Sequence, residues 1–120
     1  MNSQTILVVE DEALIAMDIQ YLLEEAGYQV LGPASTIGKA VALLETGVPD
    51  LALLDVNLGG TDVFPLADEL ASRDVKFIFL SGHSARRLPE PHLRRPLVSK
   101  PFLPATVLEA IRKEIRRTDA

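Results

Sequence analysis

Four short apolar runs in this chain end abruptly at polar residues. They cover residues 6–9, 51–54, 77–80 and 96–98, and after them come Glu10 and Asp11, Asp55, Ser81, and Ser99 with Lys100. Short apolar runs rich in Val, Ile, Leu and Phe are typical of strands that are buried on both faces of a sheet. We therefore predict four buried strands that carry carboxylates, a hydroxyl and an ammonium group where they end.

Helical patterns alternate with these runs. Residues 11–26 place apolar side chains on one stripe and stop at Gly27, a residue that favours a helix end. The stripe consists of Ile15, Ile19, Leu22, Leu23 and Ala26. Further helices are predicted over residues 36–46 and 63–72, and Pro104 is expected to open a last helix that turns Val107, Leu108, Ile111 and Ile115 inward. Residues 28–31 are predicted to form a short fifth strand that ends at Gly32 and Pro33.

The segment from Gly82 to Arg95 breaks the pattern. It contains Pro89 and Pro91 and lacks an apolar stripe long enough for an ordinary helix. We expect at most one irregular helical turn there.

Strands that alternate with helices predict an α/β fold with a parallel sheet. The carboxyl ends of parallel strands meet at one edge, and open α/β sheets bind their ligands in the crevice at that edge. The polar residues that follow the strands are therefore expected to face one another.

Composition sets limits on the class of protein. A chain of 120 residues that is 48% hydrophobic matches one domain, and without cysteine it has no disulfide or thiolate chemistry. The start lacks the basic segment of a signal peptide, and acids interrupt the first apolar run, so a soluble cytoplasmic protein without a membrane span is expected.

The net charge of −5 is distributed unevenly. Residues 1–60 hold nine acids and one base, whereas residues 61–120 hold eight acids and eleven bases. The acidic first half argues against general nucleic-acid binding, which needs many Lys or Arg residues to neutralise phosphates. The bases of the second half are either solvated charge or a docking face. Eight of these eleven bases are candidates for such a face: Arg86, Arg87, Arg94, Arg95, Arg112, Lys113, Arg116 and Arg117.

The acids at the strand ends favour a hard cation. If Glu10, Asp11 and Asp55 converge, each pair of charges near 4 Å costs about 4 kcal/mol at an effective dielectric of about 20. Oxygen ligands without His or Cys suit Mg²⁺, which takes one or two carboxylates, waters and a phosphate oxygen. Taken alone, the acidic run from Glu10 to Glu12 fits an ordinary helix start equally well.

A carboxylate beside such a metal can act as a nucleophile toward phosphorus. Asp55 is the candidate for that role, because an acid that closes a central apolar strand is costly without a partner. Lys100 would neutralise a phosphoryl oxygen and Ser81 would donate a hydrogen bond to another, although Ser81 also fits a simple strand-end cap. His83 and His92 look like surface residues without a role in catalysis.

At this point the residues resemble a known family. Glu10 and Asp11, Asp55, Ser81, and Lys100 with Pro101, in this order and spacing, resemble the receiver domain of two-component response regulators (CheY-like). The resemblance runs from Ile6 to about Ile115. It implies one receiver domain over residues 1–120, with a flavodoxin-like sheet in the order 2-1-3-4-5. It also implies phosphorylation on Asp55 by a histidine kinase or a histidine phosphotransfer protein.

The resemblance further implies the metal ligands. Asp11 would bind Mg²⁺ directly, Glu10 would assist through water, and Asp55 and the main-chain carbonyl of Asn57 would complete the shell.

Two departures from the family pattern concern the residues that would respond to the phosphoryl group. Receivers usually carry Tyr or Phe three residues before the lysine, where this chain has Leu97. Phe77, Phe79, Ser81 and Gly82 resemble the FAT GUY variant, whose motif reads Phe-x-Phe-Ala-Thr-Gly-Tyr and whose fourth helix tends to be irregular. Leu80, Ser81 and His83 depart from that motif.

Three functions follow from these patterns. The first is a single-domain receiver that acts as a switch, shuttle or phosphate sink, catalyses only its own phosphorylation and dephosphorylation, and binds a downstream protein through residues 82–95 and the last helix. The second is a small aspartyl-phosphate phosphatase, which usually has a second Asp where this chain has Asn57. The third is a pseudo-receiver that binds partners without phosphorylation.

Overall fold

The computed structural model describes residues 4–82, 88–92 and 95–117. Five parallel strands form one sheet in the order β2-β1-β3-β6-β7. They are β1 (Thr5–Val9), β2 (Gln29–Ala34), β3 (Leu51–Asp55), β6 (Lys76–Ser81) and β7 (Leu97–Ser99). Counted without the small hairpin described below, this is the predicted order 2-1-3-4-5, and the flavodoxin-like fold is confirmed.

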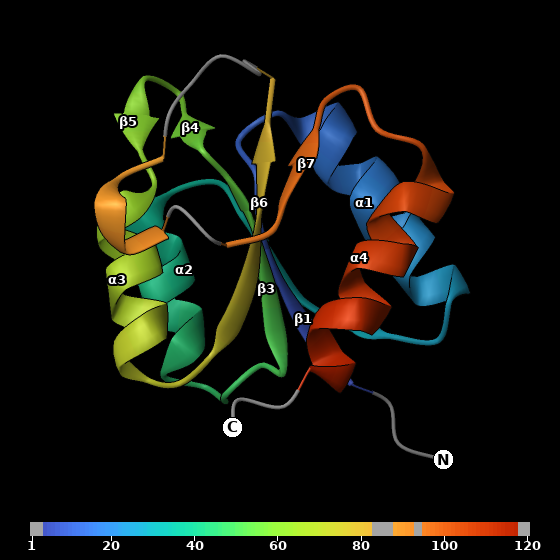
Figure 1. The fold of residues 1–120 in the computed structure, drawn as a ribbon, viewed down its shortest axis with the longest axis horizontal. Coiled ribbons are helices and arrows are strands. Elements are labelled where there is room, and N and C mark those ends of the chain that lie inside the picture. Colours follow the sequence, from blue (N-terminus) through green and yellow to red (C-terminus); the bar gives the residue numbers. More distant parts are fainter. Residues whose placement is uncertain (1–3, 83–87, 93–94, 118–120) are drawn as a thin grey trace.

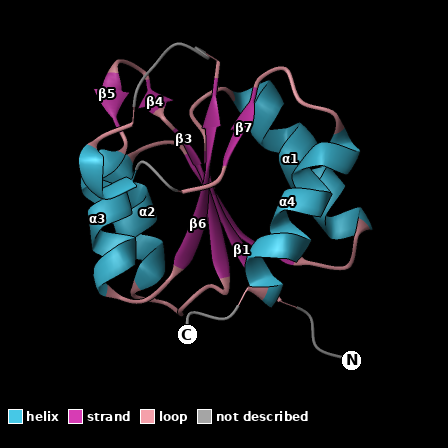
Figure 2. Ribbon diagram, in the orientation of Figure 1, coloured by secondary structure: helices cyan, strands magenta, loops and turns pink. Residues whose placement is uncertain are grey.

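Two layers of helices cover the sheet (Figure 1). Helices α2 (Ile37–Leu44) and α3 (Phe64–Ser72) lie on one face, and α1 (Ala13–Glu25) and α4 (Pro104–Arg116) lie on the other (Figure 2). Alternate residues of each central strand enter different cores: Leu7 and Val9 of β1 pack with α2 and α3, whereas Ile6 and Val8 pack with α1 and α4. This alternation explains why the strands read as continuous apolar runs.

The predicted helices are present, with shifted ends. The Thr36 side chain caps α2 by accepting a hydrogen bond from the Lys39 amide at 3.1 Å. Helix α1 begins at Ala13 rather than at residue 11, because Glu12 is the N-cap residue with an extended backbone. Glu10 and Asp11 therefore lie before the helix, at the end of β1. Among the described residues, no helix is long and apolar enough to cross a membrane.

Strand β2 continues past the point where the sequence predicts its end. It runs through Gly32 and Pro33 to Ala34, whose carbonyl accepts a hydrogen bond from the Glu10 amide at 2.9 Å. The pairing shifts register between Leu7 and Val9, and Gly32 has a φ of +98°. The prediction is wrong because this Gly-Pro pair forms an irregularity in an edge strand, where a missing amide is tolerated.

The predicted loop after Asp55 contains a hairpin. Strands β4 (Asn57–Leu58) and β5 (Thr61–Asp62) pair antiparallel around Gly59 and Gly60, both of which have positive φ angles. The hairpin lies at the upper left of Figure 1, at the edge of the sheet where the strands end, on the side of β6 away from β7.

The fourth crossover holds the single turn that was expected. Within its described part, the 3-10 helix η1 (Glu90–His92) is the regular element. Residues 83–87, which include His83, and residues 93–94 lie outside the described residues. The prediction that His92 is a surface residue is wrong: its side chain is 3% exposed and packs on phenylalanines of the sheet and of α3.

Candidate functional site

Three acids meet at the carboxyl edge of the sheet. Glu10 and Asp11 directly follow β1, and Asp55 ends the neighbouring strand β3. One carboxylate oxygen from each lies within 4.8 Å of the others. Glu10 and Asp55 are almost completely buried, whereas Asp11 is more exposed. Parallel pairing of adjacent strands thus brings together acids that lie 45 positions apart in the sequence.

Lys100 supplies the positive charge at this edge. Its Nζ donates to Glu10 Oε1 at 2.8 Å and lies 3.3 Å from Asp55 Oδ2. The backbone fixes its place, because the Lys100 amide donates to the carbonyl of Ser81 at 2.8 Å. Lys100 follows β7, as the sequence predicts, but its shorter contact is with Glu10 rather than with Asp55.

Burial dominates the titration of Asp55. Desolvation and the neighbouring Glu10 charge raise the pKa of Asp55 to about 7, against the lowering effect of Lys100 and of the Asn57 amide, which donates to Asp55 Oδ1 at 3.3 Å. Without a cation, the Asp55 carboxyl, with its pKa raised to about 7, is therefore only partly ionised near neutral pH. A bound cation would favour the charged carboxylate.

The pKa of Lys100 shifts in the direction that keeps the side chain charged. Burial lowers the pKa of Lys100, but the hydrogen bond to Glu10 and the charge of Asp55 outweigh it and raise this pKa above its ordinary value. The ammonium group is thus retained at the site throughout the neutral range.

A pocket of about 380 Å³ opens over these groups. Its floor includes Asp55 and Lys100, and its rim includes loop residues from the hairpin and from the end of β6. The lining consists of Asp11, Glu12, Asp55, Asn57, Gly59, Gly60, Gly82 and Lys100. Asn57 Oδ1 accepts a hydrogen bond from the Gly60 amide at 2.7 Å, which ties the hairpin turn together. Ser81 is 3% exposed and ends β6 beside β3.

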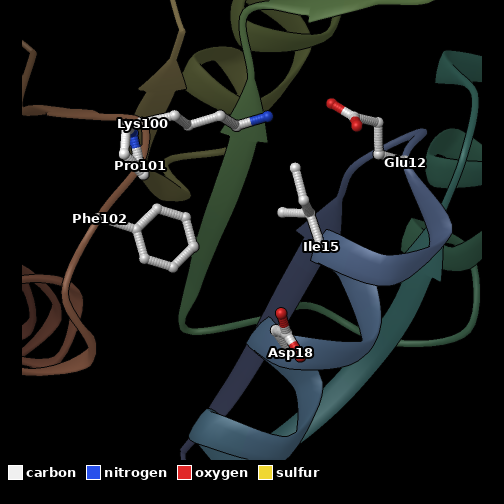
Figure 3. A pocket seen from close by; sticks show the side chains of 6 residues that line it. All are labelled: Glu12, Ile15, Asp18, Lys100, Pro101 and Phe102. Atoms are coloured by element: carbon white, nitrogen blue, oxygen red, sulfur yellow. The ribbon is translucent and has the colours of Figure 1, made fainter.

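Glu12 is a pocket residue that the sequence reading treated only as part of a helix start. It lines the pocket over Asp55 and also a second pocket of about 380 Å³ between α1 and the segment after β7. In that second pocket the Phe102 ring faces Ile15 (Figure 3). The sequence signal that could have identified Glu12 as a pocket residue is its position next to Glu10 and Asp11.

The residues at the edge fit a magnesium ion. Glu10, Asp11 and Asp55 offer oxygen atoms, and no His or Cys belongs to the cluster found among the described residues. Hard oxygen ligands in a water-accessible pocket are the environment that Mg²⁺ requires in proteins.

Comparison with known proteins identifies the family. Residues 6–112 match the response regulator receiver domain, so the chain belongs to this family and the resemblance seen in the sequence is confirmed. Domains of the family bind Mg²⁺ through acidic residues, act in general as signalling modules rather than as enzymes, and interact with histidine kinases and downstream proteins.

Individual relatives differ in how much of their length the chain covers. It is 39% identical to the phyllosphere-induced regulator PhyR of Methylorubrum extorquens over 113 residues, which cover 88% of this chain and 41% of PhyR. The solution structure of SdrG from Sphingomonas melonis has a TM-score of 0.81 at 39% identity, with 93% of this chain and 97% of that chain covered. The receiver domain of Erythrobacter litoralis PhyR has a TM-score of 0.86 at 29% identity, with 100% and 98% covered. The chain thus spans about two-fifths of the length of the curated PhyR.

Proposed function

We propose that this receiver domain accepts a phosphoryl group on Asp55 in a Mg²⁺-dependent reaction and that the phosphoryl group switches the binding of a partner protein. The observation that carries the proposal is the setting of Asp55. Its buried carboxylate has two further acids within 4.8 Å and the Lys100 ammonium at 3.3 Å. This arrangement combines a nucleophile with the charges that a phosphoryl group needs.

Each residue then has a defined task. An oxygen of the ionised Asp55 carboxylate forms a bond to phosphorus while the bond between phosphorus and the donor's nitrogen or oxygen breaks, and the leaving group departs with that electron pair. Glu10, Asp11, Asp55 and the Asn57 carbonyl would hold Mg²⁺, which neutralises charge on the transferred group. Lys100 contacts one phosphoryl oxygen, and the Ser81 hydroxyl donates to another.

Incubation of the protein with Mg²⁺ and a small phosphodonor, followed by intact-mass measurement, tests this function. We expect a mass gain of one phosphoryl group that disappears when a chelator replaces Mg²⁺. An absence of mass gain would favour the pseudo-receiver instead. Leu97 and the irregular fourth crossover are the features that suggest this alternative. Turnover of an external phosphoester would favour a phosphatase.

The donor is proposed to dock on α1 beside the site. Leu14, Met17 and Tyr21 are 78%, 62% and 67% exposed, and their spacing places them on one side of the helix. Leu103, the N-cap residue of α4 and the neighbour of Phe102, is 71% exposed. Glu12 and Lys100 line both pockets, so the pocket beside α1 adjoins the pocket that Asp55 lines, and a protein seated on this apolar surface would lie next to Asp55.

A matched pair of surface variants tests the donor surface. Met17→Lys is expected to lower kcat/KM for phosphotransfer from a phosphorylated histidine kinase or histidine phosphotransfer protein by about tenfold, the effect of losing one moderate interface contact. Val48→Lys makes the same change at a residue that is 75% exposed and precedes β3, at the other end of the sheet. Equal rates for the two variants would contradict the docking surface, and both should accept phosphate normally from a small donor.

The output surface is proposed to comprise residues 82–95 and α4. A groove of about 580 Å³ between β7 and α4 is lined by Leu97 and by basic residues of the helix, among them Arg112 and Lys113. We further propose that the chain works in the cytoplasm as a domain of residues 1–120, without acting on other substrates.

A further inference from the structure

A histidine holds η1, in the described part of the fourth crossover, against the sheet. The His92 ring lies 5.6 Å from the Phe77 ring and 5.8 Å from the Phe79 ring, edge to face with each, and it stacks on Phe64 at 6.4 Å. With its 3% exposure, His92 is a core member of an aromatic cluster that joins η1, β6 and α3. Arg95 adds a contact from the same crossover, with its Cζ 4.4 Å above the Phe77 ring.

A hydrogen bond distinguishes His92 from an apolar filler of the same space. Its Nε2 donates to Asp68 Oδ1 at 2.8 Å, because a carboxylate can only accept. Its Nδ1 is buried and has no hydrogen-bond partner among the described residues. An unpartnered buried nitrogen costs free energy that a phenylalanine would not incur. The contact that a histidine adds here is the one with Asp68.

The aromatic cluster connects His92 to the end of β6. Phe79 and Ser81 lie two positions apart on this strand, so their side chains leave the same face of the sheet. The register pairs Phe79 with Leu97, so the cluster also lies next to β7.

The cluster also connects His92 to the loop that follows Asp55. Phe64 is the first residue of α3, directly after Val63, whose amide donates to the carbonyl of Val56 at 3.1 Å. Val56 is the neighbour of Asp55. The His92 ring therefore contacts Phe79, on the strand that ends at Ser81, and Phe64, at the end of the loop that follows Asp55.

We propose that His92, held by Asp68, is a positioning residue that couples the phosphoryl state of Asp55 to the position of η1. The inference rests on the proposed phosphoryl acceptance. When Ser81 moves toward a phosphoryl oxygen, Phe79 moves with the strand, and a close-packed core passes this shift to the imidazole instead of absorbing it. Pro89 and Arg95 then follow His92 through backbone hydrogen bonds, because the His92 amide donates to the Pro89 carbonyl at 2.9 Å and the Arg95 amide to the His92 carbonyl at 3.1 Å.

Nuclear magnetic resonance on the full chain tests the coupling, with phosphoryl occupancy checked by mass. In the wild type, the imidazole signals of His92 and hydrogen exchange at the amides of residues 92 and 95 are expected to change when Mg²⁺ and a small phosphodonor are added, and in Asp55→Asn they are not. Asp68→Asn keeps the ring, and His92→Phe keeps the aromatic packing. Both variants should accept the phosphoryl group while the exchange response falls about fivefold, the factor of one net hydrogen bond.

The control variant is Glu69→Gln. Glu69 lies next to Asp68 on α3, but its carboxylate binds Arg73 Nε at 2.7 Å, so this change should leave the response intact. A mass gain without any change in the His92 signals would overturn the coupling alone, as would an undiminished response in both Asp68→Asn and His92→Phe. An absence of mass gain on Asp55 would overturn the proposed function together with the coupling.

Discussion

Replacement of Asp55 by asparagine is expected to abolish phosphoryl acceptance. The amide oxygen of asparagine is a poor nucleophile, and the substitution removes one of the three acids of the metal cluster. Neither neighbouring acid has the placement of Asp55 at the end of β3: Glu10 is 2% exposed and accepts a hydrogen bond from Lys100 at 2.8 Å, and Asp11 belongs to the turn between β1 and α1. Intact-mass measurement after incubation with Mg²⁺ and a small phosphodonor checks the loss.

The matched control is Asp74→Asn. Asp74 is exposed, follows α3 at the amino end of β6, and has a φ of 59°, a conformation that asparagine tolerates. It makes the same change of charge at the opposite end of the sheet and should phosphorylate like the wild type. An equal mass gain in Asp55→Asn and the wild type would assign the acceptor role to another residue.

The sequence was sufficient to predict which groups meet at the sheet edge. Glu10 and Asp55 come directly after apolar runs and Lys100 comes after a further such run with one residue between, and the carboxyl ends of parallel strands share one edge whatever the details of the loops. The pattern could not rank the contacts of Lys100, which lies 2.8 Å from Glu10 and 3.3 Å from Asp55. Such differences depend on side-chain rotamers, which are set by packing that leaves no periodic signal.

The errors in the sequence reading share a physical cause. Gly32 and Pro33 are common strand terminators, but an edge strand can pass through them where the register shifts. His92 sits in a segment rich in proline and arginine, and nothing local reveals that three phenylalanines distant in the sequence surround it. Both outcomes are decided by neighbours in space, so local patterns alone could not supply them.

Asp55→Asn should also stabilise the metal-free protein, increasingly so as the pH rises. Folding raises the pKa of Asp55 from 3.8 to about 7, so the folded state binds more protons than the unfolded state between those values. Stability from this group is therefore full below about pH 4 and falls by up to about 1.4 kcal/mol per pH unit until about pH 7. The asparagine side chain does not ionise, so the variant keeps its stability as the pH rises from about 4 to about 7.

Urea unfolding in the presence of a chelator measures the effect. We expect Asp55→Asn and the wild type to differ little near pH 4, and the variant to be more stable by about 2 to 4 kcal/mol near pH 8. Mg²⁺ should narrow the gap, because it binds the folded wild type and favours the ionised carboxylate there. A gap that is constant across the pH range would contradict the raised pKa, and Asp74→Asn, which leaves the acidic cluster intact, should show the same dependence on pH as the wild type.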